Sequence, residues 1–484
     1  MTGTKGWSRI SHPLTRPGPL TQLNRITPLI LAVALFMENM DSTVIATSLP
    51  AIAADIGTDP IALKLAFTAY FVALAIFIPV SGWIADRFGA NTVFRMAIGI
   101  FVVGSLCCAA SYSLETFVAS RFLQGFGASM MTPIARLVLV RVTPRSELVG
   151  AMAWLTLPGL IGPMVGPPLG GFITTIFTWH WIFLINVPIG LIGIVLASKF
   201  LPKIEKREPR PLDKSGFLLC AIWFSGLIFG LSVISLPALP PIAGIGSAVI
   251  GLLAGAAYLV SSRRKSAPLL DFRLLRKRLY RVSVLSGAIF RTGLGALPFL
   301  LPLMLQLGFG MTPLESGLIT FASAVGAMFS KVVAERLFAA VGFKWVLTFA
   351  IAIASLTMVA NAFFGPETPA PLIMGCLLIG GVMRSIFFSG NNAMGYAGVA
   401  DNEVGQATAI TAVTQQISIA LGVAIAGGVL ELSANITGGP VGLDDFHVAW
   451  VAVSALSAIA MVFYFGLPRD AGSDISGQKR RQRG

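Results

Sequence analysis

The stretch FMENMDSTVIATSLP, Phe36 to Pro50, decides how this sequence can fold. It lies in an apolar run, residues 26–49, that is long enough to cross a bilayer as a helix. Glu38 and Asp41 stand near the middle of this run, where a charged side chain costs about 2.5–3.5 kcal/mol. Because they are three residues apart, both carboxyls project from one face of the helix. That face must point into a helix bundle or a water-filled cavity, since lipid cannot solvate it.

Two roles fit this carboxyl pair. In one, Glu38 and Asp41 are neutral, hydrogen-bonded to their neighbours and purely structural. In the other they form a proton or cation site, because a carboxyl in a low-dielectric cavity can hold a proton near neutral pH. We favour the second role, since ionisable groups inside membrane spans usually mark the path of an ion or a substrate.

The composition is that of a polytopic membrane protein. Of the 484 residues, 55% are hydrophobic and 12% are charged, whereas a soluble domain has about 25% charged residues. The net charge of +14 would suit a nucleic-acid partner, but the basic residues cluster at alternate junctions between apolar runs. That placement is typical of membrane proteins whose basic loops face the cytoplasm. We therefore expect the lipid bilayer, and no nucleic acid, around this chain.

Fourteen apolar runs have the length of a membrane span. They are residues 26–49, 62–84, 92–112, 115–139, 149–175, 181–201, 216–235, 241–261, 283–307, 314–338, 345–364, 370–390, 406–431 and 446–467. The even number places both termini on one side. The charge of the loops makes that side the cytoplasm, so we expect a multi-pass protein of an inner or plasma membrane.

Two basic segments, residues 199–214 and 263–281, divide the all-α chain into six, two and six spans. Two six-span bundles related by an axis along the membrane normal are a known transporter architecture. We expect a cytoplasmic tail at 1–25, an N-terminal bundle at 26–201, basic loops with two inserted spans at 202–282, a C-terminal bundle at 283–467 and a basic cytoplasmic tail at 468–484.

Four further stretches in the first half combine small and charged residues. They are GWIADRFGANTVFR (82–95), RFLQGFGASMMTPIAR (121–136), GLIGPMVGPPLGG (159–171) and WHWIFLINVPIG (179–190). Together with MDSTVIATSLP (40–50), they resemble the major facilitator superfamily, and more closely its 14-span drug:proton antiporter branch of the EmrB/QacA type. The matching positions are Gly82, Asp86, Arg87 and Gly89; Arg121, Gln124, Gly125, Gly127 and Ala128; and Gly162, Pro163, Gly166, Pro167, Gly170 and Gly171.

The sequence departs from the family pattern at several positions. Ala90 and Asn91 replace the basic residues that follow Gly89 in the family, and His180 replaces an arginine. In span 13, Gln415 and Gln416 stand where some members have an acid. These departures put a second-half proton site and the recognition of dicationic drugs in doubt.

The loop after the second span is expected to act as a cytoplasmic gate. Gly82 allows a close helix approach, Asp86 and Arg87 can bridge to neighbouring helix ends, and Gly89 permits a tight turn. Arg95 is the remaining residue of this gate.

In the fifth span, small residues and prolines recur at a spacing of three or four and form one stripe. The stripe consists of Gly159, Pro163, Gly166, Pro167 and Gly170, and the family motif adds Gly162 and Gly171. Such a stripe lets two helices approach closely. Packing alone would explain it, but we expect it where two halves of a bundle seal and part. The resemblance implies that it prevents leak in an antiporter.

Arg121 is expected to meet Asp41. It lies six residues from Glu115, hence about 9 Å into the fourth span, and Asp41 lies about 12 Å below the outer end of the first. An arginine stays charged, so a neighbouring acid gives up its proton more readily. An acid whose proton affinity depends on whether Arg121 or a substrate is near suits an exchange mechanism. A permanent salt bridge is the alternative.

The sequence therefore predicts a proton-coupled antiporter that exports amphipathic organic compounds or drugs by alternating access. Proton coupling is assigned to Asp41, Glu38 and Arg121, and the substrate cavity to Glu38, Gln124, Arg384 and Gln415. No phosphate-binding loop, metal-ligand cluster or catalytic set occurs, so we expect no cofactor, no metal and no enzyme activity. A proton symporter for a metabolite and a non-transporting membrane sensor or scaffold are the alternatives. The sequence leaves open whether a periplasmic adaptor takes part.

Overall fold

A computed structural model describes residues 22–144, 147–202, 204, 211–234, 240–400 and 403–468. These residues form helices and turns without a strand, which confirms the predicted all-α fold class. Most of the two predicted tails and residues 205–210 of the first basic segment lie outside the described residues. Residues 22–25 of the predicted N-terminal tail already belong to the first helix.

The described residues up to Phe200 form eight α-helices and one 3₁₀ helix. These elements are α1 (Gln22–Val44), η1 (Ile45–Ser48), α2 (Leu49–Ile56), α3 (Lys64–Phe88), α4 (Ala90–Ala109), α5 (Leu114–Val142), α6 (Leu148–Ile176), α7 (Trp181–Leu184) and α8 (Asn186–Phe200). The first span is longer than residues 26–49, because the chain tightens into η1 and then continues through α2.

Two helices follow, α9 (Lys214–Val233) and α10 (Pro241–Arg263), which pack closely on each other. The second half contains η2 (Phe272–Arg276), α11 (Arg278–Gly295), α12 (Leu297–Leu303), η3 (Met304–Gly308), α13 (Pro313–Val341), α14 (Phe343–Ala360), η4 (Asn361–Phe363), α15 (Ala370–Tyr396), α16 (Val404–Thr437), α17 (Leu443–Ile459) and α18 (Val462–Phe465).

Thirteen stretches in the described part of the chain are long and apolar enough to cross a membrane. They correspond to every predicted span except residues 314–338. Those residues lie in α13, a helix of 29 residues that packs against α6 and α15 and is also long enough to cross.

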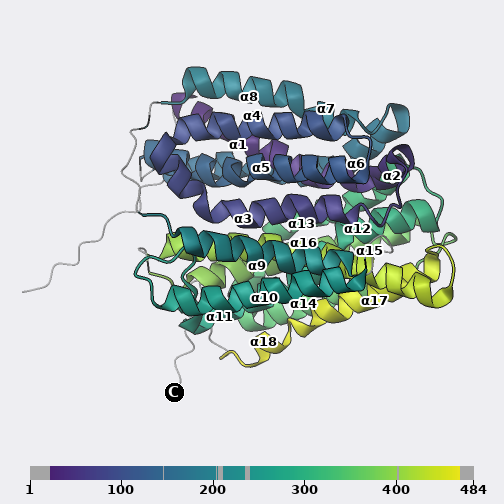
Figure 1. The fold of residues 1–484 in the computed structure, drawn as a ribbon. Helices are drawn as coiled ribbons and strands as arrows, with labels where there is room; N and C mark the ends of the chain where they lie inside the picture. The colour runs from purple at the N-terminus through teal and green to yellow at the C-terminus, as the bar shows by residue number, and fades with distance from the viewer. Residues whose placement is uncertain are drawn as a thin grey trace, which may run out of the picture.

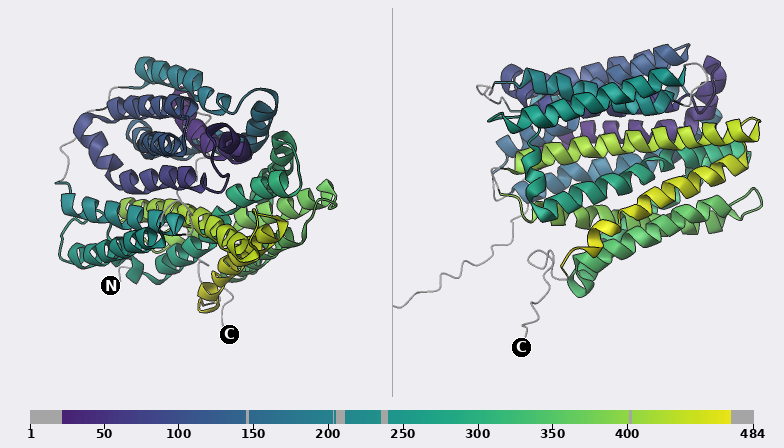
Figure 2. Two further views of the ribbon diagram at one scale, coloured as in Figure 1. Left: turned by 45° about the vertical axis from the view of Figure 1, so that its right-hand side comes forward. Right: turned by 60° about the horizontal axis from the view of Figure 1, so that its bottom comes forward.

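The long helices lie side by side in two groups (Figure 1). Helices α1–α8 form the upper group in this view and α11–α18 the lower one, and the turned views show the same grouping (Figure 2). Helix α9 packs against α3 of the first group and α16 of the second. The division of the chain at residues 202 and 282 stays a prediction.

Contacts between the two groups are concentrated at one end of the bundle. We call the end with the turns 57–63, 309–312 and 438–442 the acidic end, and the opposite end the basic end. Toward the acidic end, hydrogen bonds between described side-chain and backbone groups join the two groups of helices. They run from Lys64 Nζ to Glu431 Oε2 (2.5 Å), from Gln306 Nε2 to the Thr47 carbonyl (2.9 Å), and from the Leu314 amide to Thr175 Oγ1 (3.2 Å).

Candidate functional site

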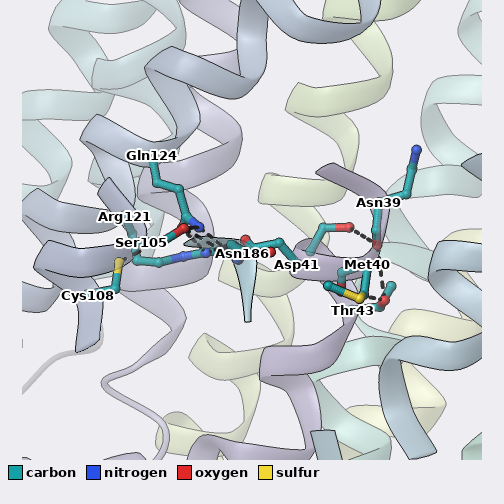
Figure 3. A network of polar contacts seen from close by, with 10 residues as sticks. Asn39, Met40, Asp41, Thr43, Ser105, Cys108, Arg121, Gln124 and Asn186 are labelled. Carbon is teal, nitrogen blue, oxygen red and sulfur yellow. Dashed lines mark hydrogen bonds and ion pairs between the residues drawn. The ribbon is translucent and has the colours of Figure 1, made fainter. Parts of the chain in front are cut away.

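The carboxylate of Asp41 lies at the centre of a buried polar network inside the first group of helices (Figure 3). Its side chain, on α1, is 0% exposed. Arg121 Nη1, from α5, donates to Oδ2 at 2.7 Å. Gln124 Nε2 and Asn186 Nδ2 donate to Oδ1 at 2.7 and 2.8 Å. Four helices therefore contribute to this network, because Gln124 of α5 and Asn186 of α8 also donate to Ser105 of α4.

The residues that donate to Asp41 are themselves contacted by one hydroxyl group and two aromatic rings. Ser105 Oγ, on α4, accepts from Gln124 Nε2 at 2.8 Å and from Asn186 Nδ2 at 3.3 Å. The Tyr70 ring from α3 lies 4.4 Å from Arg121 Cζ, and the Phe183 ring lies 5.8 Å from it. The Arg121 guanidinium thus lies close to two aromatic rings, which is a favourable position for a cation.

The network matches an ionised Asp41. Three donors and one full positive charge surround an acceptor-only carboxylate, which is the arrangement that a buried charge requires. Arg121 Nε and Asn186 Oδ1 are buried without a hydrogen-bond partner. A proton arriving on Asp41 would remove the charge that holds Arg121, and one donor would have to turn away. Proton uptake and rearrangement of Arg121 are therefore linked in this geometry.

Glu38 lies one turn before Asp41 on α1 but contacts a different group. Its Oε2 accepts a hydrogen bond from Thr132 Oγ1 of α5 at 2.6 Å. Arg136, one turn further along α5, is exposed and is close enough for its charge to act on Glu38. Glu38 is half-buried whereas Asp41 is buried completely. The two acids share a helix face as expected, but they stand in separate surroundings.

No hydrogen bond or ion pair among the described residues joins the four residues predicted to line a substrate cavity, Glu38, Gln124, Arg384 and Gln415, and their shared role stays a prediction. Gln124 belongs to the Asp41 network, as described above. Arg384, on α15, is half-buried and donates to Ser323 Oγ of α13. Gln415, on α16, is half-buried and makes no hydrogen bond to another described residue.

The glycine stripe of α6 packs mainly against α1. A Cβ at Gly162 would lie 2.9 Å from the Phe36 carbonyl oxygen, and one at Gly170 would lie 2.3 Å from the Val44 carbonyl oxygen. Gly159 and Gly166 face α1 in the same way, and Pro163 and Pro167 lie inside the same helix. The structure thus places the glycines at 159, 162, 166 and 170 against α1, and the role of the stripe where the two halves seal and part stays a prediction. A flat helix face fits any close neighbour, and here that neighbour is α1.

Only the acidic-end part of the stripe reaches the second group. A Cβ at Gly171 would lie 2.3 Å from the Pro313 carbonyl oxygen of α13. In return, a Cβ at Gly317 of α13 would lie 2.3 Å from the Pro167 carbonyl oxygen. Backbone therefore touches backbone where α6 meets α13.

The residues predicted to form a cytoplasmic gate are connected within the first group. Asp86 accepts from Arg141 Nη2 at 2.5 Å, which joins the basic ends of α3 and α5. Gly89 turns the chain with a φ of 95°, in the region that favours glycine. Arg95 Nη1 donates to Ser198 Oγ of α8 at 3.3 Å. Arg87 is exposed and has no ion pair with another described residue.

Gly82 does not have the role that its place in the motif predicts. It is exposed, and a Cβ built there would meet no atom within 4 Å. The expected close helix approach is therefore absent at this residue, because the exposed face of α3 points away from its neighbours.

Sequence reasoning missed two members of the Asp41 network, Ser105 and Asn186. Asn186 did leave a signal, as an amide inside the apolar stretch WHWIFLINVPIG. Ser105 left no such signal in the sequence, because serine is common in membrane helices and its hydroxyl can form its hydrogen bonds locally. Among the described residues, no group of three or more His, Cys, Asp or Glu side chains could hold a metal ion.

Comparison with known proteins gives consistent results over nearly the whole chain. A family model described as Major Facilitator Superfamily matches residues 31–299 and 283–484. The "Putative multidrug resistance protein MdtD" of Yersinia enterocolitica serotype O:8 / biotype 1B is 33% identical over 451 residues, which are 92% of this chain and 95% of that protein. The protein of the same name from Escherichia fergusonii is 31% identical over 462 residues, 94% of this chain and 97% of its own.

Among solved structures, the crystal structure of a D-xylose-proton symporter resembles this chain with a TM-score of 0.67. The match covers 93% of this chain and 99% of the symporter at 13% identity. At that identity the likeness concerns the fold alone.

Proposed function

This chain belongs to the Major Facilitator Superfamily, a family of membrane transporters, and on that premise we propose that it exports amphipathic organic compounds in exchange for protons. The names of its relatives support a multidrug substrate range. We place it in an inner or plasma membrane with its basic end in the cytoplasm, following the distribution of charged residues. It works by alternating access between the two groups of helices.

One observation carries the proton-coupling part of this proposal. Asp41 is fully buried near the middle of a membrane-spanning helix and bonded directly to Arg121 at 2.7 Å. Such a pair is costly to build, because removing both charges from water outweighs much of their attraction. A transporter gains from it, since a proton and Arg121 compete for the same carboxylate.

The conformation fits one step of the exchange. A closed acidic end and an Asp41 paired to Arg121 are what we expect of the state that follows proton release to the basic side. A proton from the acidic side reaches Asp41 only after that end has opened. The proton's inward free energy, about 2.3 kcal/mol per charge at 100 mV before any pH difference, then drives substrate outward.

Transport by the purified full chain in proteoliposomes tests the proposal. With an inward proton gradient imposed, uphill export of a fluorescent amphipathic dye is the expected result. Uptake of the compound together with protons would identify a symporter. No gradient-dependent flux of any compound in a chemically diverse panel would favour a sensor or scaffold and contradict the proposal.

A further inference from the structure

A shallow groove runs along the last turns of α10 and ends at the basic end of the bundle. It has a volume of about 560 Å³ and is lined by Ala256, Ala257, Val260, Ser261, Arg264 and Lys265. These residues form two rows at a spacing of four, so they share one face of the helix. Small side chains leave the groove open over most of its length, and the basic residues stand only at its end.

The face of α10 that carries the groove is exposed and apolar. α10 packs on α9 and η2, and exposed positions continue along its other side. Leu252 and Leu253, which precede Ala256 and Ala257 by four residues, are exposed, and so is Val260 in the groove itself. In a bilayer such side chains contact acyl chains, so the groove opens to lipid.

The positive charge at the end of the groove that is available to a ligand belongs to Arg264. Lys265 Nζ is already bonded to Asp213 and, at 2.7 Å, to Ser215 Oγ, both at the start of α9. Arg264 is exposed and takes part in no ion pair with another described residue. The pair between Lys265 and Asp213 thus holds the end of the groove against α9, while the guanidinium of Arg264 keeps its donors for a ligand.

The dimensions of the groove suit one amphipathic anion. Arg264 lies eight residues beyond Ala256, hence about 12 Å along the helix axis. In a phospholipid, the phosphate and the upper part of the acyl chains lie within a similar distance, because the headgroup layer borders the hydrocarbon directly. A guanidinium can hydrogen-bond two phosphate oxygens at once, and basic pockets beside membrane helices bind anionic headgroups.

We propose that this groove is a binding site for one anionic phospholipid, with the phosphate at Arg264 and an acyl chain along Ala256 and Ala257. The occupant is a membrane lipid and not a transported compound, because the groove opens on the exposed face of α10. The bound lipid lies next to the ion pair between Lys265 and Asp213 and so holds the same ends of α9 and α10 together from outside. The site requires neither proton coupling nor export.

Lipid binding to the purified full chain in a neutral detergent, counted by native mass spectrometry, tests this inference. The probes are palmitoyl-oleoyl phosphatidylglycerol and the phosphatidylcholine with the same acyl chains, which differ in headgroup and net charge. The first phosphatidylglycerol should bind at least about tenfold more tightly than phosphatidylcholine, since a charged hydrogen bond is worth that factor or more. Arg264→Gln should remove this preference and change phosphatidylcholine binding by less than about twofold.

Three further variants separate a built site from general attraction to charge. Arg264→Lys keeps the charge and should keep most of the preference, because lysine also binds phosphate. Ala257→Trp fills the groove without a change of charge and should weaken the binding of both lipids. Arg281→Gln removes an exposed arginine near the start of α11, outside the groove, and should change binding by less than about twofold. Without added lipid, all four variants should unfold close to the temperature of the unchanged protein, since the altered side chains are exposed.

Equal affinity for the two lipids would overturn the inference, and so would unchanged phosphatidylglycerol binding by both Arg264→Gln and Ala257→Trp. An equal loss in Arg281→Gln and Arg264→Gln would overturn it as well, because that result marks attraction to the basic end as a whole. Displacement of the lipid by free glycerol phosphate would show that the site takes a soluble phosphate and not a lipid. Export in proteoliposomes is a separate measurement, and its failure contradicts only the proposed function.

Discussion

At the scale of single residues, the Asp41 network contains one acid that can lose its charge and one base that cannot. Asp41 holds a proton or Arg121, whereas Arg121 stays charged at any accessible pH. Gln124 and Asn186 donate to the same carboxylate oxygen, Oδ1. We therefore propose Asp41 as the residue whose protonation state changes during transport, with Arg121, Gln124 and Asn186 as its surroundings.

Asp41→Asn should abolish uphill export while leaving substrate binding within about threefold. The amide keeps the size and one acceptor of the acid but can neither take up nor release a proton. Proton-driven dye export in proteoliposomes measures the first effect, and equilibrium binding measures the second. Glu367→Gln, in an exposed loop, is the matched control and should export normally. If Asp41→Asn pumps at the normal rate, Glu38 becomes the leading proton carrier.

At the scale of elements, the position of α1 depends on its close packing against α6. Three of the glycines of α6 bring its backbone against the backbone of α1, over the turns that carry Glu38 and Asp41. The 3₁₀ turn η1 follows directly, and its Thr47 accepts a hydrogen bond from Gln306 of the second group. We therefore expect a movement of α6 to displace the part of α1 that carries Glu38 and Asp41, and with it the contact between the groups.

Gly170→Ala and Gly166→Leu should leave the protein in the membrane but reduce export at least about tenfold. A Cβ at position 170 would lie 2.3 Å from the Val44 carbonyl oxygen, and one at position 166 would lie 2.1 Å from Thr43 Oγ1, so α1 must shift. Membrane yield and initial export rate are the measurements. Gly99→Ala, inside α4 where nothing lies within 4 Å, should be harmless. Normal export by both stripe variants would show that α1 tolerates the displacement.

Asp213, at the start of α9 and outside the membrane-spanning helices, allows the pH dependence of stability to be tested. Asp213 caps α9 by accepting from the Gly216 amide at 2.8 Å, and it also accepts from Lys265 Nζ. Burial acts to raise the pKa of Asp213, but the hydrogen bonds from Lys265 and Gly216 outweigh it and hold the pKa below its ordinary value of 3.8. An acid with a lowered pKa stabilises the folded protein while it is ionised, and the gain disappears as pH falls through that lowered pKa.

Asp213→Ala should therefore lower the unfolding temperature at pH 7, by the equivalent of about 1 kcal/mol for a lost cap. The difference from the unchanged protein should shrink below the ordinary value of 3.8. Thermal unfolding in detergent across this pH range gives the measurement, with Glu367→Ala as the control. A difference that stays constant down to the lowest pH would assign the effect to packing instead of charge.

At the scale of the whole molecule, hydropathy, charge and motif order were enough to predict the helical fold and the family. The meeting of Asp41 and Arg121 was predictable too, because a helix has a fixed rise per residue and both residues interrupt apolar runs. The helix that packs against the glycine stripe of α6 was not predictable, because small residues indicate a flat helix face but do not indicate which helix covers it. Nor were the hydrogen-bond partners of Glu38 and Arg384, Thr132 and Ser323, which depend on how the helices pack.

The acidic end is held closed in part by a buried ion pair between the two groups. Lys64 on α3 and Glu431 on α16 lie 2.5 Å apart, and their side chains are 0% and 10% exposed. In the proposed mechanism of alternating access this end has to open, so the pair would break in every cycle. Removing one partner of a buried pair destabilises the paired state by several kcal/mol, because the other charge is left behind.

Glu431→Gln should therefore shift the protein toward a conformation that is open at the acidic end. A cysteine at the buried position of Ser48, in a background without the four native cysteines, reports this opening through its rate of labelling by a membrane-impermeant maleimide. We expect the rate to rise on the order of tenfold, since 1.4 kcal/mol already corresponds to that factor. Exchanging the charges, Lys64→Glu with Glu431→Lys, should restore slow labelling. Glu403→Gln breaks the pair with Lys277, which lies within the second group at the basic end, and should leave the rate unchanged. Equal labelling in Glu431→Gln and Glu403→Gln would mean that the helix contact between α6 and α13, and not the ion pair, closes this end.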